Sequence, residues 1–215
     1  KCDPLVTNDC NQITAKIDID NSLKTILYAP SFYPSSIDKL IPILPKLSCE
    51  NNLVIKLHNF SWYQDQYRYQ SKAMMQLAEN NKNIFLAPQD DYNIIPYYSI
   101  ADLLISDISS TMFEYLYLNR PIIMAECYEL RLKHKIFKKR FLKKMDLKRM
   151  EEVDFVMRFN NPEDLVSLVY HELEHPDDLE SERLSAQKEY LFKVDGKASF
   201  RMVNAIESNL SGAKS

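Results

Sequence analysis

Short apolar runs alternate along this chain with segments whose apolar residues recur at helical spacing. Each run is nearly continuous rather than alternating with polar residues, which is typical of strands buried on both faces of a sheet. Strands that alternate with helices indicate an α/β fold, with a parallel sheet covered by helices on both faces. The expected strands are residues 25–30, 53–58, 84–88, 102–106 and 121–124.

Helical spacing fills the intervals between these strands. Pro42 and Pro45 are expected to shorten or bend the first helix, because proline lacks the N–H that a helix interior uses. A further strand is predicted at residues 155–157. Residues 1–22 are polar and aperiodic and are interpreted as a lead-in segment, with one domain over residues 23–215. The expected helices are residues 37–47, 66–80, 94–100 (short helix or turn), the segment that ends at Leu118, and residues 162–174, 180–191 and 195–210.

The residues most suited to binding a ligand follow the end of the fourth expected strand. Asp107-Ile108-Ser109-Ser110-Thr111 follows the apolar run directly, and a helix pattern begins there. Ligands of open α/β sheets bind at the carboxyl ends of strands, and a helix N-terminus offers N–H groups to an anion. The hydroxyls of Ser109, Ser110 and Thr111 would add donors for a phosphate or diphosphate. The competing interpretation is that Ser109 or Ser110 only caps the helix.

Composition narrows the possible functions. Hydrophobic residues make up 46% of the 215 residues, enough for a sizeable core, and the net charge of −3 gives no case for nucleic-acid binding. Gly196 and Gly212 are the two glycines, which excludes glycine-rich phosphate loops and the Gly-x-Ser-x-Gly turn of serine hydrolases. Cys49 and Cys127 are expected to be small buried residues. A Cys2–Cys10 disulfide is conceivable, but the scattered cysteines favour a reducing, cytoplasmic setting.

Basic residues are concentrated between Arg131 and Arg149, which hold ten lysines and arginines and one acidic residue, Asp146. Phe137, Phe141 and Met145 recur at four-residue spacing and predict a basic amphipathic helix. Such a helix suits an anionic membrane surface or an anionic polymer. The alternative is that its aromatic face packs on its own domain. The lysines proposed for anionic contact are Lys138, Lys139, Lys143 and Lys144.

One sequence pattern suggests a metal site. Residues His171 to His175 fit His-Glu-x-x-His, the pattern of zinc peptidases. The segment is very acidic, lies just before Pro176, and has no third histidine downstream to complete the ligand set. No metal site is therefore predicted, and a zinc hydrolase remains an alternative.

Several separated segments, in consistent order, together resemble the C-terminal half of the CDP-glycerol glycerophosphotransferase (teichoic acid polymerase) family. The resemblance runs over residues 24–210, and its most specific part is the Asp-x-Ser-Ser segment with its flanks. These segments are Leu27-Tyr28-Ala29-Pro30, Lys56-Leu57-His58, Ala101 to Ser110, Met112-Phe113-Glu114, Arg120-Pro121 and Asp195 to Arg201.

The resemblance implies one Rossmann-like lobe of a GT-B architecture, the lobe that holds the nucleotide donor. The family's N-terminal lobe carries a Trp-His-Gly-Thr segment, which Ser61-Trp62-Tyr63 does not match. An N-terminal partner lobe is therefore expected, and this chain alone is expected to have little activity. After Ala29-Pro30, where many members have a basic residue, the chain has Ser31 and Phe32, so one phosphate contact is expected to be lost.

The resemblance also implies roles for individual residues. His58 corresponds to an essential histidine that contacts phosphate or acts as general acid for the departing CMP. Ser109, Ser110 and Thr111 would hold the diphosphate. Glu114 would accept from ribose hydroxyls or only complement the helix dipole, and Asp107 is expected to fix the turn rather than contact the ligand.

The implied reaction transfers an alditol phosphate from a CDP-linked donor to an anionic polymer or lipid-linked acceptor. No cofactor is implied beyond the nucleotide of the donor. The expected location is the cytoplasm, including the inner face of the bacterial cell membrane. Two alternatives are a GT-B glycosyltransferase that uses a UDP- or GDP-sugar and a non-catalytic module that binds anionic polymer through residues 131–149.

Overall fold

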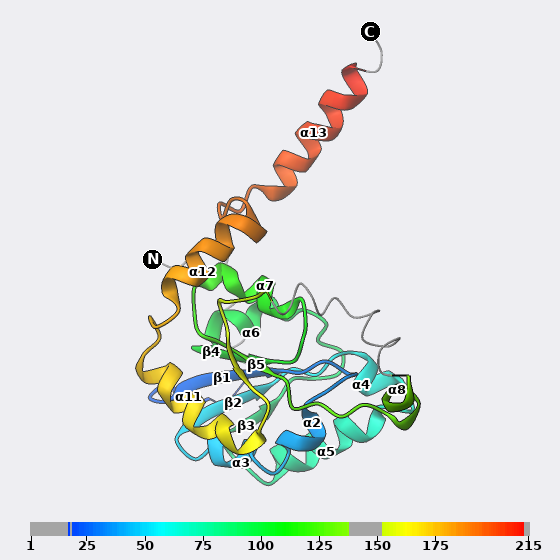
Figure 1. The fold of residues 1–215 in the computed structure, drawn as a ribbon, viewed down its shortest axis with the longest axis vertical. Coiled ribbons are helices and arrows are strands. Elements are labelled where there is room, and N and C mark those ends of the chain that lie inside the picture. Colours follow the sequence, from blue (N-terminus) through cyan, green and yellow to red (C-terminus); the bar gives the residue numbers. More distant parts are fainter. Residues whose placement is uncertain (1–16, 18, 138–151, 213–215) are drawn as a thin grey trace.

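The protein is described by a computed structural model that covers residues 17, 19–137 and 152–212 (Figure 1). Its centre is a six-stranded sheet in which every neighbouring pair of strands is parallel. The strand order is β3-β2-β1-β4-β5-β6, so the chain reverses its direction of winding between β1 and β4. The strands are β1 (Lys24–Ala29), β2 (Asn51–Ile55), β3 (Ile84–Leu86), β4 (Leu103–Ser106), β5 (Ile122–Ala125) and β6 (Met157–Phe159).

Helices cover both faces of the sheet. One face is packed by α2 (Ile37–Leu40), α3 (Leu44–Leu47), α5 (Arg68–Glu79) and α11 (Leu165–Glu174). The other is packed by α6 (Ile95–Ile100), α7 (Thr111–Tyr115) and α12 (Glu180–Ala186). The remaining elements are α4 (Phe60–Tyr63), the turns η1 (Leu116–Leu118), η2 (Pro162–Asp164) and η3 (Gln187–Leu191), α8 (Leu132–Ile136) and α13 (Ala198–Gly212).

Burial on both faces explains the continuous apolar runs. Successive side chains of a strand point to opposite faces. In β1, Ile26 and Tyr28 join the core under α2 and α5, and Leu27 and Ala29 join the core under α6 and α7. All four are buried, so the predicted parallel α/β sheet is confirmed. Ile17, within the lead-in segment, is also buried in the second core.

Three local predictions need correction. The helix expected over 37–47 is two short helices, because the chain turns between them at Pro42. The strand expected at 155–157 forms two residues later as β6, where Met157 pairs with Ile123; Phe155 and Val156 are buried ahead of it. Cys49 is exposed rather than buried, whereas Cys127 is buried as expected.

The C-terminal part leaves the body of the domain. Helix α13 projects away from the sheet (Figure 1), and its apolar residues, including Phe200, Met202 and Leu210, are exposed. In the part of the chain that the structure describes, no helix has the length and apolar character needed to cross a membrane.

The structure describes only the start of the predicted basic helix. Helix α8 buries no residue, and the Phe137 side chain after it is exposed, so this part of the aromatic face does not pack on the domain. Phe141, Met145 and the lysines proposed for anionic contact lie outside the described residues, as do Cys2 and Cys10.

Candidate functional site

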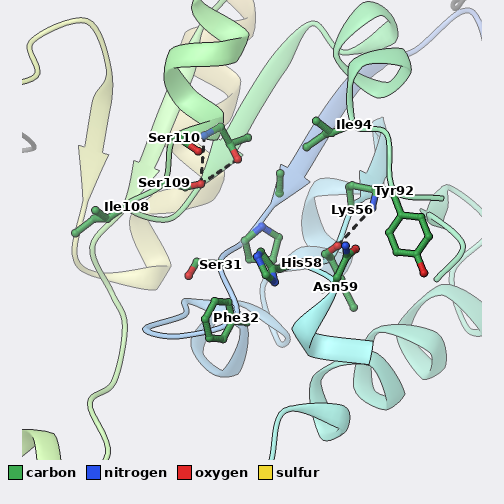
Figure 2. A pocket seen from close by; sticks show the side chains of 14 residues that line it. Ser31, Phe32, Lys56, His58, Asn59, Tyr92, Ile94, Ile108, Ser109 and Ser110 are labelled. Atoms are coloured by element: carbon green, nitrogen blue, oxygen red, sulfur yellow. Dashed lines mark hydrogen bonds between the residues drawn. The ribbon is translucent and has the colours of Figure 1, made fainter. Parts of the chain in front are cut away.

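A pocket of about 350 Å³ lies at the carboxyl ends of β1, β2 and β4 (Figure 2). This is the point between β1 and β4 where the winding reverses, the usual ligand position in an open α/β sheet. Segments that are far apart in the sequence meet here. The lining residues are Ala29, Pro30, Ser31, Phe32, Lys56, Leu57, His58, Asn59, Tyr92, Ile94, Ile108, Ser109, Ser110 and Thr111.

His58 stands in the pocket just beyond β2, and its ring orientation is fixed from two sides. The backbone N–H of Phe60 donates to Nδ1 of His58 at 3.1 Å, and the Phe32 and Phe60 rings lie 4.7 Å and 5.0 Å from the imidazole. Burial, and secondarily the charge of Lys56, lower the pKa of His58. With Nδ1 occupied as an acceptor, the neutral ring carries its proton on Nε2. His58 can therefore offer an N–H donor to an anion.

Ser109, Ser110 and Thr111 form the opposite wall, but the three hydroxyls are not equivalent. The Ser109 Oγ accepts from the Thr111 backbone N–H at 3.2 Å and donates to the Thr111 Oγ1 at 2.9 Å. Ser110 is exposed, stands at the N-cap position of α7, and makes no side-chain cap hydrogen bond. The capping interpretation thus describes Ser109, whereas the Ser110 hydroxyl is available to a ligand.

Asp107 follows the last residue of β4 and is buried. Its carboxylate accepts backbone N–H groups from Ser31 at 2.8 Å and from Ser36 at 3.1 Å. Burial raises the pKa of Asp107 to about 7, against the opposing effect of these hydrogen bonds. Asp107 ties the loop after β1 to the end of β4 and is not among the residues that line the pocket.

Glu114 is outside the pocket. It lies within α7, where its carboxylate accepts the Tyr98 hydroxyl at 3.0 Å. The structure therefore brings His58 together with Ser109, Ser110 and Thr111, but leaves Glu114 with a contact to α6 instead of a place in the pocket wall.

Lys56 lines the pocket, although the sequence analysis assigned it no role. It lies two residues before His58, in the segment between β2 and α4, and both residues line the pocket. Only 6% of Lys56 is exposed. One sequence feature could have identified it: Lys56 interrupts a run of apolar residues two positions before the candidate His58. Tyr92 and Ile94, in the loop that follows β3, border the same pocket (Figure 2).

The His-Glu-x-x-His segment does not form a zinc-peptidase arrangement. Glu172 is buried, while His171 and His175 lie on the outer side of α11. The His171 Nε2 contacts the Asp178 carboxylate at 2.8 Å. Within residues 17, 19–137 and 152–212, no group of three or more histidine, cysteine or acidic side chains is arranged to hold a metal ion.

Solved structures share this fold. The wall teichoic acid polymerase TagF matches with a TM-score of 0.62 and 20% identity over 96% of this chain and 48% of that one. A glycosyltransferase from Rickettsia africae matches with a TM-score of 0.60, 15% identity, and 96% and 52% coverage. UDP-GlcNAc 2-epimerase from Neisseria meningitidis, bound to UDP-GlcNAc, matches with a TM-score of 0.55, 17% identity, and 94% and 48% coverage.

The chain spans about half the length of these structures, which confirms the expected Rossmann-like half of a two-lobed GT-B fold. No curated protein matches the sequence significantly. A family model described as CDP-glycerol:poly(glycerophosphate) glycerophosphotransferase matches residues 1–208. The chain therefore belongs to the CDP-glycerol glycerophosphotransferase family.

Proposed function

We propose that this chain is the donor-binding half of an enzyme that transfers an alditol phosphate from a CDP-linked donor to a growing polymer. The observation that carries the proposal is the pocket in which His58 faces Ser109, Ser110 and Thr111 at the switch point of the sheet. Family membership supplies the reaction class, and the pocket supplies groups suited to a diphosphate. The partner lobe and the acceptor site belong to a second half of the enzyme.

The reaction gives each pocket residue a task. The acceptor hydroxyl oxygen bonds to the phosphorus that carries the alditol and loses its proton to a base of the partner lobe or to water. The bond from that phosphorus to the bridging oxygen breaks, and CMP leaves with the electron pair of that bond. Negative charge grows on the leaving phosphate. The Nε2–H of His58 donates to that oxygen: the neutral ring acts as a hydrogen-bond donor, and only the protonated imidazolium could act as general acid. The Ser110 hydroxyl holds a non-bridging oxygen.

A calorimetric titration tests the proposal. The 215-residue chain is titrated with CDP, UDP and GDP, and the Ser110→Ala variant serves as the site control. We expect selective CDP binding that weakens in the variant. Selectivity for UDP or GDP would instead favour a nucleotide-sugar transferase, consistent with the epimerase likeness. Equal affinities of wild type and Ser110→Ala for all three nucleotides would contradict a donor site in this pocket.

Location follows from the same proposal. A CDP-linked donor is a cytoplasmic metabolite type, and the acceptor is an anionic or lipid-linked polymer, so the enzyme would act in the cytoplasm at the inner face of the membrane. The exposed Leu132, Ile136 and Phe137 beside Lys133 and Lys135 suit an anionic surface. Sedimentation of the chain with vesicles that contain an anionic lipid, compared with zwitterionic vesicles, measures this contact.

A further inference from the structure

Lys56 is a buried cation with little to balance it inside the protein. Among the described residues its ammonium contacts the Leu57 carbonyl oxygen at 3.5 Å, the long limit of a hydrogen bond, and no carboxylate lies within ion-pair distance. Burying a charge without a partner is costly. Burial accordingly lowers the pKa of Lys56, and Asp91 opposes this effect only in part.

The surroundings of Lys56 suit an anion rather than a hidden partner. None of the residues that line the pocket is acidic. Asp91, the acidic residue whose charge reaches Lys56, already accepts the Tyr97 hydroxyl at 2.7 Å. Figure 2 shows Lys56 between His58 and Asn59 on one side and the loop of Tyr92 and Ile94 on the other. The ammonium is thus held at the wall of the cavity with unused donors.

Apart from Lys56, the residues of the pocket supply little positive charge to balance a diphosphate. Helix α7 has only five residues, and its first N–H, that of Thr111, is occupied by Ser109. Burial, and secondarily the charge of Lys56, lower the pKa of His58 and so favour its neutral form. Ser109, Ser110 and Thr111 supply hydroxyls without charge. Among the described residues that line the pocket, Lys56 is the one lysine or arginine.

We infer that Lys56 is the charge partner of the donor's diphosphate, and that it makes this pocket select diphosphate over monophosphate ligands. The inference rests on the proposed function for the identity of the donor, but the anion site itself can be tested without a nucleotide. A lysine is a compact point charge with three donors, so it can bridge oxygens of both phosphate groups.

The same argument predicts how stability responds. Lys56→Met replaces a buried charge by an apolar side chain of similar length, and so removes the cost of burying that charge without an ion-pair partner. We therefore expect the thermal midpoint of the ligand-free variant to equal or exceed that of wild type. A loss of affinity in a variant that is no less stable separates binding from folding.

The test uses inorganic pyrophosphate, phosphate and CDP as probes of the 215-residue chain. Lys56→Met is expected to weaken pyrophosphate and CDP at least about tenfold and phosphate much less, since a hydrogen bond to a charged group exceeds the roughly 1.4 kcal/mol of one decade. Lys56→Arg is expected to restore most of the affinity. Lys82→Met, the same change at an exposed position, is the matched control and should leave all three unchanged.

The outcomes separate the two proposals. Pyrophosphate binding that is absent in wild type, or equal in wild type and Lys56→Met, would overturn the role of Lys56. CDP binding that persists unchanged in Lys56→Met would overturn it too, and would leave the donor function standing. Lys56-dependent pyrophosphate binding, combined with a preference for UDP or GDP over CDP, would support the charge partner and contradict the CDP-linked donor.

Discussion

The backbone N–H of Phe60 donates to Nδ1 of His58 at 3.1 Å. Because Phe60 begins α4, this hydrogen bond links the tautomer of the imidazole to the position of a helix. The proton of the neutral ring is therefore on Nε2. The Phe32 ring packs against the imidazole, with the two ring centroids 4.7 Å apart. Orientation, tautomer and lowered pKa all favour a neutral donor at this point of the pocket.

Two amide variants separate the two nitrogens of His58. The Oδ1 of His58→Asn can accept from the Phe60 N–H but offers no donor at the Nε2 position, whereas the amide of His58→Gln reaches that position. We expect Gln to keep more pyrophosphate affinity than Asn, because only the glutamine amide can donate at the Nε2 position. Imidazole ¹⁵N shifts of the wild type measure the tautomer directly. A resting Nδ1–H form, or equal affinities of the two variants, would refute the assignment.

The two serines at the start of α7 should respond differently. Ser109→Ala removes the hydroxyl that holds the Thr111 N–H, so we expect a loss of stability of about 1 kcal/mol. Ser110→Ala removes an exposed hydroxyl without a cap bond, so stability should stay within about 0.5 kcal/mol while CDP affinity falls. Urea unfolding and calorimetry of both variants provide the comparison. Equal CDP affinity of wild type and Ser110→Ala would contradict a donor site in this pocket and leave the serines with a capping role alone.

The fold was predictable because the burial of strands and helices determines where apolar residues stand in the sequence. Strands buried on both faces give continuous apolar runs, and these runs located β1 to β5 within a few residues. β6 was misplaced because Phe155 and Val156 are as buried as strand residues, although they precede the strand. No local pattern distinguishes a buried loop residue from a buried strand residue. The break in the helix at Pro42, by contrast, could be predicted, because proline lacks the backbone N–H that a helix interior uses.

The candidate site was predictable only in part. His58 and the Ser109–Thr111 segment carry the family pattern, and their meeting follows from parallel strands that end at one edge. The role of Lys56 depends on its deep burial and on the loop after β3, which borders the same pocket. The contact of Glu114 with Tyr98 depends on the packing of α6 against α7. Neither the placement of Lys56 nor the contact of Glu114 can be predicted from the neighbouring residues in the sequence.

Glu114→Gln tests whether this residue contributes to donor binding. Its carboxylate accepts the Tyr98 hydroxyl at 3.0 Å, and it does not line the pocket. We expect the affinities for CDP and pyrophosphate to change less than about twofold, because the glutamine oxygen still accepts from Tyr98. Calorimetry with both ligands is informative, since a weaker affinity for CDP with unchanged pyrophosphate binding would restore the ribose role.

Affinity for pyrophosphate should fall as the pH rises in the alkaline range. The pKa of Lys56 is lowered by burial, so the free protein loses this charge at a lower pH than a surface lysine does. The charged and titratable groups that face it are Asp91 and Tyr92 of the loop after β3 and His58 beyond β2. Lys56→Arg keeps its charge throughout. Titrations between about pH 7 and pH 10 should therefore show a decline in wild type and a flatter profile in Lys56→Arg; parallel profiles would argue against Lys56.

Asp107 should make the stability of the fold depend on pH. Its pKa is raised by burial from 3.8 to about 7, so between these values the native state binds a proton that the unfolded chain releases. Its contribution is therefore complete below about pH 4 and is lost as the pH rises through about 7. The shift corresponds to a free energy on the order of 4 kcal/mol. Asp107→Asn cannot titrate, and it also loses one acceptor for the N–H groups of Ser31 and Ser36.

The difference in free energy of unfolding between wild type and Asp107→Asn isolates this carboxyl group from all others that titrate. We expect the difference to shrink steadily from pH 4 to pH 7 and to be constant at higher pH. Urea unfolding of both proteins at intervals of pH measures it. A difference that grows with pH would mean that the hydrogen bonds from Ser31 and Ser36 outweigh burial and hold Asp107 ionised. In that case the loop after β1 would be anchored by a charged carboxylate, and the pocket wall would loosen on acidification instead.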